Sequence, residues 1–450
     1  MSETIFHVRP GGALRGRLRV PGDKSISHRA IMLGSLADGV TEISGFLQGD
    51  DCLATLRAFQ AMGVQIDGPN DGPNDEPDAS SDANTVVIHG VGIDGLQAPK
   101  QPLDMGNAGT SMRLLSGLLA GQRFDSVLTG DASLSKRPMR RVTEPLGLMG
   151  ARLTTTAQGT APIQISGGQS LHGIEYHLPM ASAQVKSCLL LAGLYASGTT
   201  CVTEPAPTRD HTERMLSGFG YPVQRHGATV SLQGGGRLQA GKIDVPADIS
   251  SAAFFLVGAS IAPDSDLVLE HVGMNPTRAG VIEILRQMGA DLELLDQRLA
   301  GGEPVADIRV RYAPLHGIHI APELVPLAID EFPALFIAAA CAEGTTVLSG
   351  AEELRAKESD RIQVMADGLN ALGISAKPTA DGIVIHGGQM GGNVDIQSHH
   401  DHRISMSFSM AALRAQSELR IHDCQFVNTS FPGFVSLAAA AGLQIDSRKL

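Results

Sequence analysis

The chain has 450 residues, and its 35 Lys and Arg against 47 Asp and Glu give a formal net charge of −12 at pH 7. Apolar residues make up 43% of the chain, which is enough for sizeable cores and excludes wholesale disorder. The acidic balance and the lack of Trp argue against nucleic acid as a partner, because binding it needs clustered Lys and Arg and aromatic side chains for stacking.

No segment of the sequence predicts a membrane or secretory protein. The apolar stretches near 254–261 and 335–341 are much shorter than the roughly 20 residues that span a bilayer, and residues 1–11 contain no apolar core of a secretory signal. The five cysteines are odd in number, widely spaced and without a CxxC pair, which favours buried, reduced thiols. We therefore expect a soluble, cytoplasmic protein.

The sequence contains six similar units, and a strand-like segment within the first 20 residues precedes them. Residues 13–20 form this predicted strand, which could cross over to complete the second half of the chain. Each unit contains an amphipathic helix that ends in an apolar residue and Gly and runs into a short strand. The six glycines are Gly63, Gly150, Gly220, Gly289, Gly373 and Gly442. Glycine ends a helix in the left-handed conformation without a Cβ clash, so these positions predict six helix ends.

A second piece recurs upstream of most of these glycines. It is a helix rich in Ala and Leu, then a turn of small residues, then a strand, and it occurs at 36–46, 191–204, 339–350 and 411–424. The alternative is a generic α/β protein whose helices happen to end in Gly, but this alternative does not explain why two pieces recur in phase. Six units of about 75 residues predict two similar domains, with a boundary near 241–245.

The segment 67–84 breaks the repeat. It is acidic, rich in Pro, Gly, Ser and Asn, and contains GPND twice. Such a composition buries too little apolar surface to order itself. We expect a mobile surface loop there and assign no chemistry to it.

Basic residues are few, and several precede apolar runs at predicted helix starts. Three such starts are at 21–29, 106–113 and 181–186, where Gly, Ser, Thr or Asn accompany Lys24, Arg29 and Arg113. A helix N-terminus binds anions readily, since its N–H groups lack partners and carry partial positive charge. Helix capping alone is the alternative explanation for each Ser, Thr or Asn. GDKS lacks the Gly that a Walker A loop needs before Lys, so ATP use gains no support.

Further charged residues lie at 135–141, 355–361 and 399–403. If 355–361 is helical, Lys357 and Arg361 share a face at i, i+4, with a surface salt-bridge ladder as the alternative interpretation. The histidines at 399–402 have no partner cluster elsewhere in the sequence, which disfavours a metal site. Asp330 precedes the apolar run 332–338, where helix capping is again the alternative. Together these features predict a pocket for two or more oxyanion groups, with carboxylates beside it for acid–base chemistry.

Nine sequence blocks resemble the enolpyruvyl transferase family, and within it the enzymes that act on shikimate 3-phosphate. The blocks are PGDKSISHR (21–29), GNAGTSMR (106–113), KRP (136–138), PMASAQVKS (179–187), RDHTERM (209–215), AIDEFP (328–333), ELRAKESDR (353–361), DHRISMSF (401–408) and TSFPGF (429–434). The resemblance implies a two-domain inside-out α/β barrel, with three βαββαβ units around a pseudo-threefold axis in each domain. The domains would be 1–20 with 246–450, and 21–245.

The resemblance also implies a reaction, in the shikimate pathway to chorismate and aromatic amino acids. The enolpyruvyl group of phosphoenolpyruvate would pass to the 5-hydroxyl of shikimate 3-phosphate, with release of phosphate and closure of the two domains. Asp330, Glu358 and Lys24 would be catalytic. Shikimate 3-phosphate would bind Lys24, Ser25, Arg29, Ser182, Ala183, Gln184, Arg209, Asp330 and Lys357. Phosphoenolpyruvate would bind Lys24, Gly109, Arg137, Gln184, Arg361 and Arg403. The family implies no cofactor and no metal, and we expect a monomer.

Two departures leave the response to the inhibitor glyphosate open. PMASAQVKS and RDHT resemble a second bacterial branch that includes glyphosate-tolerant members, whereas Gly109 matches the sensitive type. Thr429 stands where the enterobacterial branch has a Lys.

Two other functions remain as alternatives: enolpyruvyl transfer to UDP-N-acetylglucosamine, and polyanion binding without catalysis. The lack of a Cys at 129–135 disfavours the first, and the retained Asp330 and Glu358 disfavour the second.

Overall fold

The computed structural model describes residues 3–69 and 84–449. Contacts divide the chain into two compact units, which are described separately here. Unit 1 contains Met1–Pro21, Pro246–Leu299 and Glu303–Leu450, and unit 2 contains Gly22–Val245 with Ala300–Gly302. Of the segment 67–84 that the sequence predicts to be a mobile loop, residues 70–83 lie outside the described residues.

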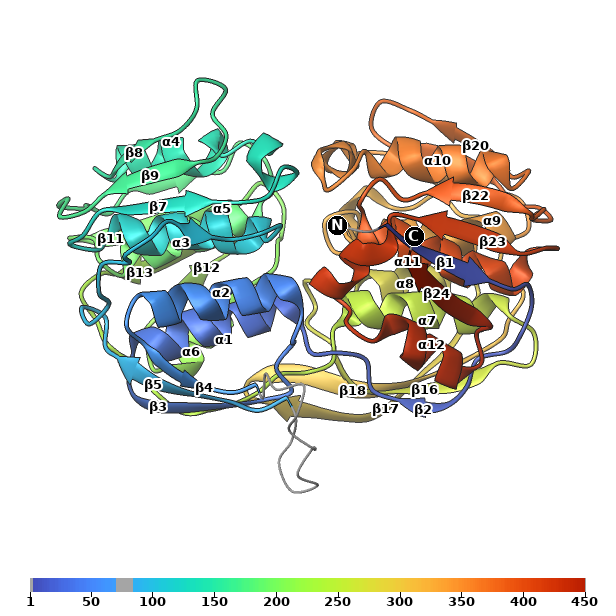
Figure 1. The fold of residues 1–450 in the computed structure, drawn as a ribbon, viewed down its shortest axis with the longest axis horizontal. Coiled ribbons are helices and arrows are strands. Elements are labelled where there is room, and N and C mark those ends of the chain that lie inside the picture. Colours follow the sequence, from blue (N-terminus) through green and yellow to red (C-terminus); the bar gives the residue numbers. More distant parts are fainter. Residues whose placement is uncertain (1–2, 70–83, 450) are drawn as a thin grey trace. The chain divides into compact units, whose positions relative to one another are not determined.

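Three helices in each unit are buried along nearly their whole length. In unit 2 these central helices are α1 (Lys24–Leu36), α3 (Gly109–Ala120) and α5 (Ala183–Gly193). In unit 1 they are α7 (Ile249–Ile261), α9 (Phe332–Cys341) and α11 (His402–Ala411). Every residue of α7 is buried. The sequences of α7 and α9 are apolar on nearly all sides, as expected of helices in the interior of a protein. Within each unit Figure 1 shows the central helices covered by strands.

The outer helices end as the sequence predicts. They are α2 (Asp50–Ala61), α4 (Arg140–Leu148), α6 (His211–Gly218), α8 (Gly280–Gln287), α10 (Arg361–Ala371) and α12 (Phe434–Ala441). Each is followed within two residues by one of the six predicted glycines, whose φ angles lie between +77° and +119°. A side chain would be strained at these φ angles, so the six predicted helix ends are confirmed.

Six sheets surround the central helices in the described part of the chain. In unit 2 the first sheet has the strand order β14 (Leu238–Gln239), β3 (Ala37–Ser44), β5 (Val86–Val91), β4 (Gln65–Asp67), and β15 (Lys242–Asp244) also pairs with β3. The second sheet has the order β6 (Leu103–Asp104), β7 (Ser126–Thr129), β9 (Ile163–Ser166), β8 (Arg152–Thr154). The third sheet has the order β10 (Glu175–His177), β11 (Thr199–Thr203), β13 (Thr229–Gln233), β12 (Gln224–His226). In unit 1 the first sheet has the strand order β17 (Asp291–Ala300), β18 (Glu303–Arg311), β16 (Asp266–Gly273), β2 (Arg15–Leu18). The second sheet has the order β19 (Thr345–Leu348), β21 (Ile383–His386), β20 (Ser375–Pro378). The third sheet has the order β22 (Val394–Gln397), β23 (Leu419–His422), β1 (Thr4–Val8), β24 (Ile445–Lys449).

The sheets of unit 2 repeat one pattern of pairing. The strand that follows a central helix pairs in parallel with a short strand on one side and antiparallel with a longer partner on the other. Thus β11 is parallel to β10 and antiparallel to β13, while β7 is parallel to β6 and antiparallel to β9. On β9, Ile163 and Ile165 are buried and the residues that alternate with them are exposed, as in a sheet with one face on a core. The repeat read from the sequence is therefore a structural repeat.

Two strands near the start of the chain, Thr4–Val8 and Arg15–Leu18, complete two sheets of unit 1. β2 is parallel to β16, and it is shorter than the segment 13–20 predicted as a strand. β1 lies between β23 and β24 and is antiparallel to both. β1 lies before the segment 13–20 and is not predicted from the sequence. The start of the chain is thus built into the unit that also contains its end.

Candidate functional site

The first turns of the central helices of unit 2 are joined by side-chain hydrogen bonds. Gln184 at the start of α5 donates from Nε2 to Thr110 Oγ1 at the start of α3, over 3.1 Å. Ser111 Oγ lies 3.1 Å from Nδ1 of His28, in the first turns of α1. Three helix N-termini therefore meet, and each adds partial positive charge and N–H donors. This arrangement suits an anionic ligand, as the sequence predicted for these helix starts.

Lys24 is held at the start of α1 by a carboxylate from the next helix. Its Nζ lies 3.0 Å from Oδ2 of Asp51 on α2, and the two side chains are 18% and 10% exposed. The helix is capped by Asp23, which accepts from the Ile26 amide, so neither Ser25 nor Ser27 supplies the cap. Asp51 was not among the residues predicted from the sequence. The only signal for it was the Asp50–Asp51 pair at the start of a predicted helix.

Gly109 provides the space in which Arg137 lies. A Cβ at this position would be 3.1 Å from Nη1 of Arg137 and 3.7 Å from Nη1 of Arg113. Arg137 Nη2 donates to Asn107 Oδ1 over 2.6 Å, and Asn107 Nδ2 donates to Asp131 over 2.7 Å. Asn107 therefore orients an arginine. It does not cap α3, whose first turn has no side-chain cap.

The start of α5 combines a cap with a charged contact. Ser182 caps the helix by accepting from the Val185 amide over 3.4 Å, so the capping alternative holds for this residue. Gln184 accepts from Nη1 of Arg113 through its Oε1. Ala183 is the first residue of α5, and Arg209 stands two residues before α6 and is partly exposed. The predicted residues of unit 2 are thus at or near helix starts.

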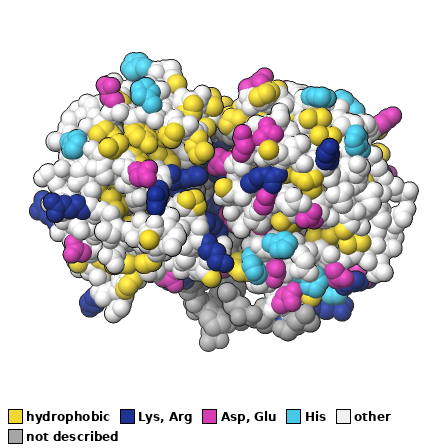
Figure 2. Space-filling model, turned by 90° about the horizontal axis from the view of Figure 1, so that it is seen from above, with side chains coloured by type: hydrophobic (Ala, Val, Ile, Leu, Met, Phe, Trp, Pro, Cys, Tyr) yellow, Lys and Arg dark blue, Asp and Glu magenta, His cyan; other side chains and the backbone are white. Residues whose placement is uncertain are grey.

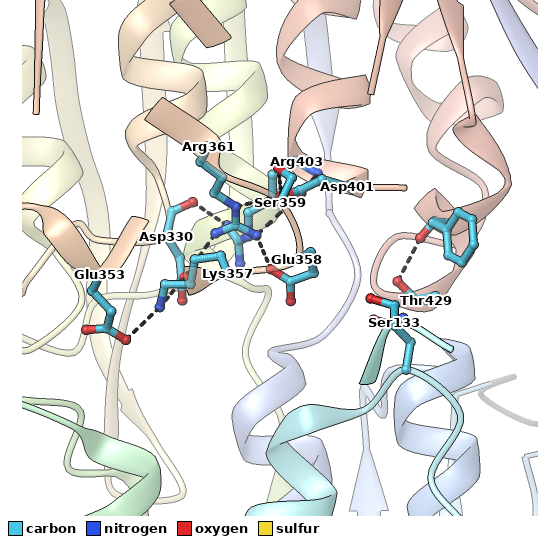
Figure 3. A network of polar contacts seen from close by, with 12 residues as sticks. Ser133, Asp330, Glu353, Lys357, Glu358, Ser359, Arg361, Asp401, Arg403 and Thr429 are labelled. Carbon is cyan, nitrogen blue, oxygen red and sulfur yellow. Dashed lines mark hydrogen bonds and ion pairs between the residues drawn. The ribbon is translucent and has the colours of Figure 1, made fainter. Parts of the chain in front are cut away.

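In unit 1 a buried arginine organises the carboxylates (Figure 3). Arg361 is 1% exposed, and its Nε lies 2.8 Å from Oδ2 of Asp401, which is fully buried. Its Nη2 donates to Glu358 over 2.6 Å, and its Nη1 lies 3.3 Å from Oδ1 of Asp330. Burial alone would lower the pKa of Arg361, but the charges of Asp401, Glu358 and Asp330 raise it overall. Arg361 therefore stays charged and fixes two of the predicted catalytic carboxylates.

Asp330 lies among cations at the start of α9. Lys357 Nζ is 3.5 Å from its Oδ1, and Arg403 Nη1 donates to its backbone oxygen over 2.7 Å. The helix has no side-chain cap, so the capping alternative fails for Asp330. Asp401, which belongs to the matched block DHRISMSF and lies among the histidines at 399–402, caps α11 by accepting from the Arg403 amide. One buried carboxylate thus supports both predicted arginines, Arg361 and Arg403.

Residues 355–361 do not form one helix, which was the condition for Lys357 and Arg361 to share a helix face. Residues Glu352–Ala356 form a short 3-10 turn, Lys357 is extended, and α10 begins at Arg361. The reason is that Asp360 accepts from the Gln363 amide and so caps α10 at that point. Lys357 and Arg361 therefore do not share a helix face, but both side chains reach Oδ1 of Asp330.

The described part of the chain shows no group of three or more His, Cys, Asp or Glu arranged to hold a metal ion. No helix among the described residues is long and apolar enough to cross a membrane. On the face shown in Figure 2, Lys and Arg side chains occur in small groups among acidic and neutral ones. A net charge of −12 is therefore compatible with local groups of positive charge.

Comparison with known proteins agrees with this arrangement. The chain is similar to the enolpyruvyl transferase NikO from Streptomyces tendae over the full length of both chains, with a TM-score of 0.78 and 16% identity. It is also similar to the EPSP synthase of Acinetobacter baumannii, with a TM-score of 0.87 and 59% identity over 99% of this chain and 100% of that one. The fold is therefore the two-domain inside-out α/β fold of the enolpyruvyl transferases.

Sequence comparison narrows the class further. Residues 8–437 match the family model of EPSP synthase (3-phosphoshikimate 1-carboxyvinyltransferase). The 3-phosphoshikimate 1-carboxyvinyltransferase of Methylococcus capsulatus is 67% identical over 99% of both chains. That of Alkalilimnicola ehrlichii is 67% identical over 98% of this chain and 96% of its own. The chain belongs to the EPSP synthase family.

Proposed function

We propose that this chain transfers the enolpyruvyl group of phosphoenolpyruvate to the 5-hydroxyl of shikimate 3-phosphate, in the shikimate pathway to chorismate and aromatic amino acids. Membership of the EPSP synthase family supports the reaction. The structural observation that carries it is the buried Arg361, which holds Asp330 and Glu358 within 3.3 Å of one guanidinium. Carboxylates repel anionic substrates, so their retention beside Lys357 and Arg403 supports acid–base chemistry over simple anion binding.

The reaction needs proton transfers that these groups can perform. The 5-hydroxyl oxygen bonds to C2 of phosphoenolpyruvate while C3 gains a proton, which gives a tetrahedral intermediate. Loss of the C3 proton and of the phosphate group restores the double bond. Asp330 is the base towards the 5-hydroxyl, and Glu358 with Lys24 transfers the proton at C3. Lys24 and the cations around Asp330 compensate negative charge that develops in the transition state.

Substrate binding is assigned by matched position. Shikimate 3-phosphate is held by Lys24, Ser25, Arg29, Ser182, Ala183, Gln184, Arg209, Asp330 and Lys357. Phosphoenolpyruvate is held by Lys24, Gly109, Arg137, Gln184, Arg361 and Arg403. The meeting helix starts of unit 2 and the Arg361 network of unit 1 support this assignment. We also propose that 1–20 with 246–450 and 21–245 act as the two domains, in a cytoplasmic monomer that binds neither membrane nor nucleic acid.

A phosphate-release assay tests the reaction. Purified protein with phosphoenolpyruvate and shikimate 3-phosphate should release inorganic phosphate, and UDP-N-acetylglucosamine in place of shikimate 3-phosphate should give none. Release of phosphate with UDP-N-acetylglucosamine but not with shikimate 3-phosphate would favour enolpyruvyl transfer to the nucleotide sugar. Binding of both substrates without release under any condition would favour a binding protein that has no catalysis.

Replacing Asp330 tests the base. Asp330→Ala should lower kcat by about a thousandfold, within the range of a lost general base, while calorimetry still detects both substrates. The matched control is Asp367→Ala, because Asp367 is an exposed residue of α10 that contacts Gln363 on its own helix. Survival of kcat in Asp330→Ala would show that another group removes the proton.

A further inference from the structure

The side chain of Arg29 is held at three of its nitrogens. Arg29 lies on α1 and is 4% exposed. Its Nε donates to Thr212 Oγ1 over 2.6 Å, and its Nη2 donates to Ser187 Oγ over 2.9 Å. Its Nη1 donates to the backbone oxygen of Ser25 over 2.8 Å. A guanidinium is a rigid planar fork, so three bonds to different nitrogens fix both its plane and its rotation.

Thr212 and Ser187 act on Arg29 as a pair. Thr212 Oγ1 donates to Ser187 Oγ over 2.8 Å, and the two residues are 1% and 0% exposed. Because the Thr212 hydrogen points to Ser187, its lone pairs face Arg29 Nε. Ser187 Oγ accepts from both Thr212 and Arg29. The two hydroxyls therefore form one acceptor surface against one edge of the guanidinium.

A buried ion cluster fixes the helices that carry these hydroxyls. Lys186 on α5 is fully buried, and its Nζ lies 2.7 Å from Glu213 on α6 and 3.0 Å from Glu204. Lys186 precedes Ser187 in sequence, and Glu213 follows Thr212. Ion pairs shielded from water depend strongly on geometry, so this cluster sets the spacing of α5 and α6. The same spacing brings the two hydroxyls to hydrogen-bonding distance.

We infer that Thr212 and Ser187 are positioning residues, which orient Arg29 towards an anionic group of shikimate 3-phosphate. The inference rests on the proposed function, in which Arg29 binds that substrate. Neither hydroxyl needs to touch the ligand. Their effect reaches it through the orientation of one guanidinium, so it acts on the binding of shikimate 3-phosphate and leaves the chemical step intact.

Thr212→Val tests the inference, because Val keeps the shape of Thr and lacks the hydroxyl. The dissociation constant and KM for shikimate 3-phosphate should each rise about tenfold, the effect of one lost bond to a charged group. kcat and the KM for phosphoenolpyruvate should stay within about twofold. Thr212→Ser should restore the wild-type values. Ser187→Ala should act in the same direction, and it keeps the inference testable if Thr212→Val does not fold.

Ser116→Ala is the matched control. Ser116 is a buried hydroxyl of unit 2 whose bond runs to Met112 within its own helix, so its loss should leave all constants unchanged. Shikimate without its phosphate distinguishes the two anionic groups of the substrate. If Thr212→Val weakens the binding of shikimate as much as that of shikimate 3-phosphate, Arg29 contacts the carboxylate that both molecules share. If Thr212→Val weakens only the binding of shikimate 3-phosphate, Arg29 contacts the phosphate.

Two further outcomes separate this inference from the proposed function. If Arg29→Lys weakens binding of shikimate 3-phosphate while Thr212→Val and Ser187→Ala do not, positioning by the hydroxyls is refuted and the proposed function stands. If the wild-type protein itself does not bind shikimate 3-phosphate, both are refuted. A parallel loss of kcat and of binding for both substrates in Thr212→Val would indicate general structural damage and would also refute the inference.

Discussion

In both units, buried carboxylates hold the charged side chains of the candidate site in place. The sequence alone does not show which carboxylate pairs with which cation. Asp401 is fully buried and holds Arg361, and Asp51 holds Lys24. Removing one member of such a pair leaves an uncompensated charge away from water, which costs several kcal/mol. The site therefore depends on carboxylates that need not touch a substrate. In the proposed function, their contribution is to keep each cation in one place before the ligand binds.

His28 offers a test of burial at the residue scale. The ring is fully buried, its Nδ1 lies 2.8 Å from Thr55 Oγ1, and burial together with Lys24 and Arg29 lowers its pKa well below 6.5. In the unfolded chain it titrates near 6.5. Below that pH the unfolded state binds a proton that the folded state does not, so stability falls as pH falls.

We predict that this one histidine adds a slope approaching about 1.4 kcal/mol per pH unit to the unfolding free energy below its unfolded pKa. His28→Asn keeps a polar atom near the Nδ1 position and cannot titrate. Urea unfolding at a series of pH values from neutral to mildly acidic should therefore give a flatter curve for the variant. Parallel curves for the two proteins would show that the folded ring takes up the proton.

At the scale of elements, the glycines at the ends of the outer helices affect the stability of the fold, and substitutions can measure this effect. Gly218 is the last residue of α6 and Gly220 follows two residues later, and a Cβ would meet nothing within 4 Å at Gly218 and only Gln239 at 3.7 Å at Gly220. They differ in backbone conformation, because Gly220 has a φ of +77°. Space is therefore equal at the two positions, and conformation alone distinguishes them.

We predict opposite effects of Ala at these two positions. Gly220→Ala should destabilise unit 2 by about 1 kcal/mol through left-handed strain, and Gly218→Ala should stabilise it by about 0.5 kcal/mol through helix propensity. Urea titration of both variants beside the wild type gives the two shifts. Equal shifts of the same sign would mean that α6 does not end where the structure places it.

The elements also show what could be predicted from the sequence. Helix ends were predictable because glycine and capping residues act locally, and the six glycines all have positive φ. β1 was missed because its partners are remote in the chain: Phe6 pairs with Ile421 and with Ser447. A helix over 355–361 is absent because the Asp360 side chain caps α10, which begins at Arg361. The matched motifs gave the candidate residues, but Asp51 and Asp401 became partners only through tertiary packing.

At the scale of the whole molecule, the net charge of −12 does not show that the residues proposed to bind substrate are unevenly distributed between the two units. Of the residues proposed for shikimate 3-phosphate, only Asp330 and Lys357 belong to unit 1. The others belong to unit 2, at or near the starts of α1, α5 and α6. Negative charge on the remaining surface does not oppose binding strongly, since salt screens exposed charges beyond about 10 Å.

Shikimate 3-phosphate alone should therefore stabilise unit 2 more than unit 1. At a concentration about 100 times its dissociation constant, a ligand that binds only the folded state adds about 2.7 kcal/mol of stability to the part that holds it. We predict that amide hydrogen exchange slows most in the first turns of α1, α5 and α6, and little in α7 and α11. Phosphoenolpyruvate added afterwards should extend protection to α10 and α11, which carry Arg361 and Arg403. Equal protection of both units by shikimate 3-phosphate alone would contradict the assignment, because most of its proposed contacts come from one unit.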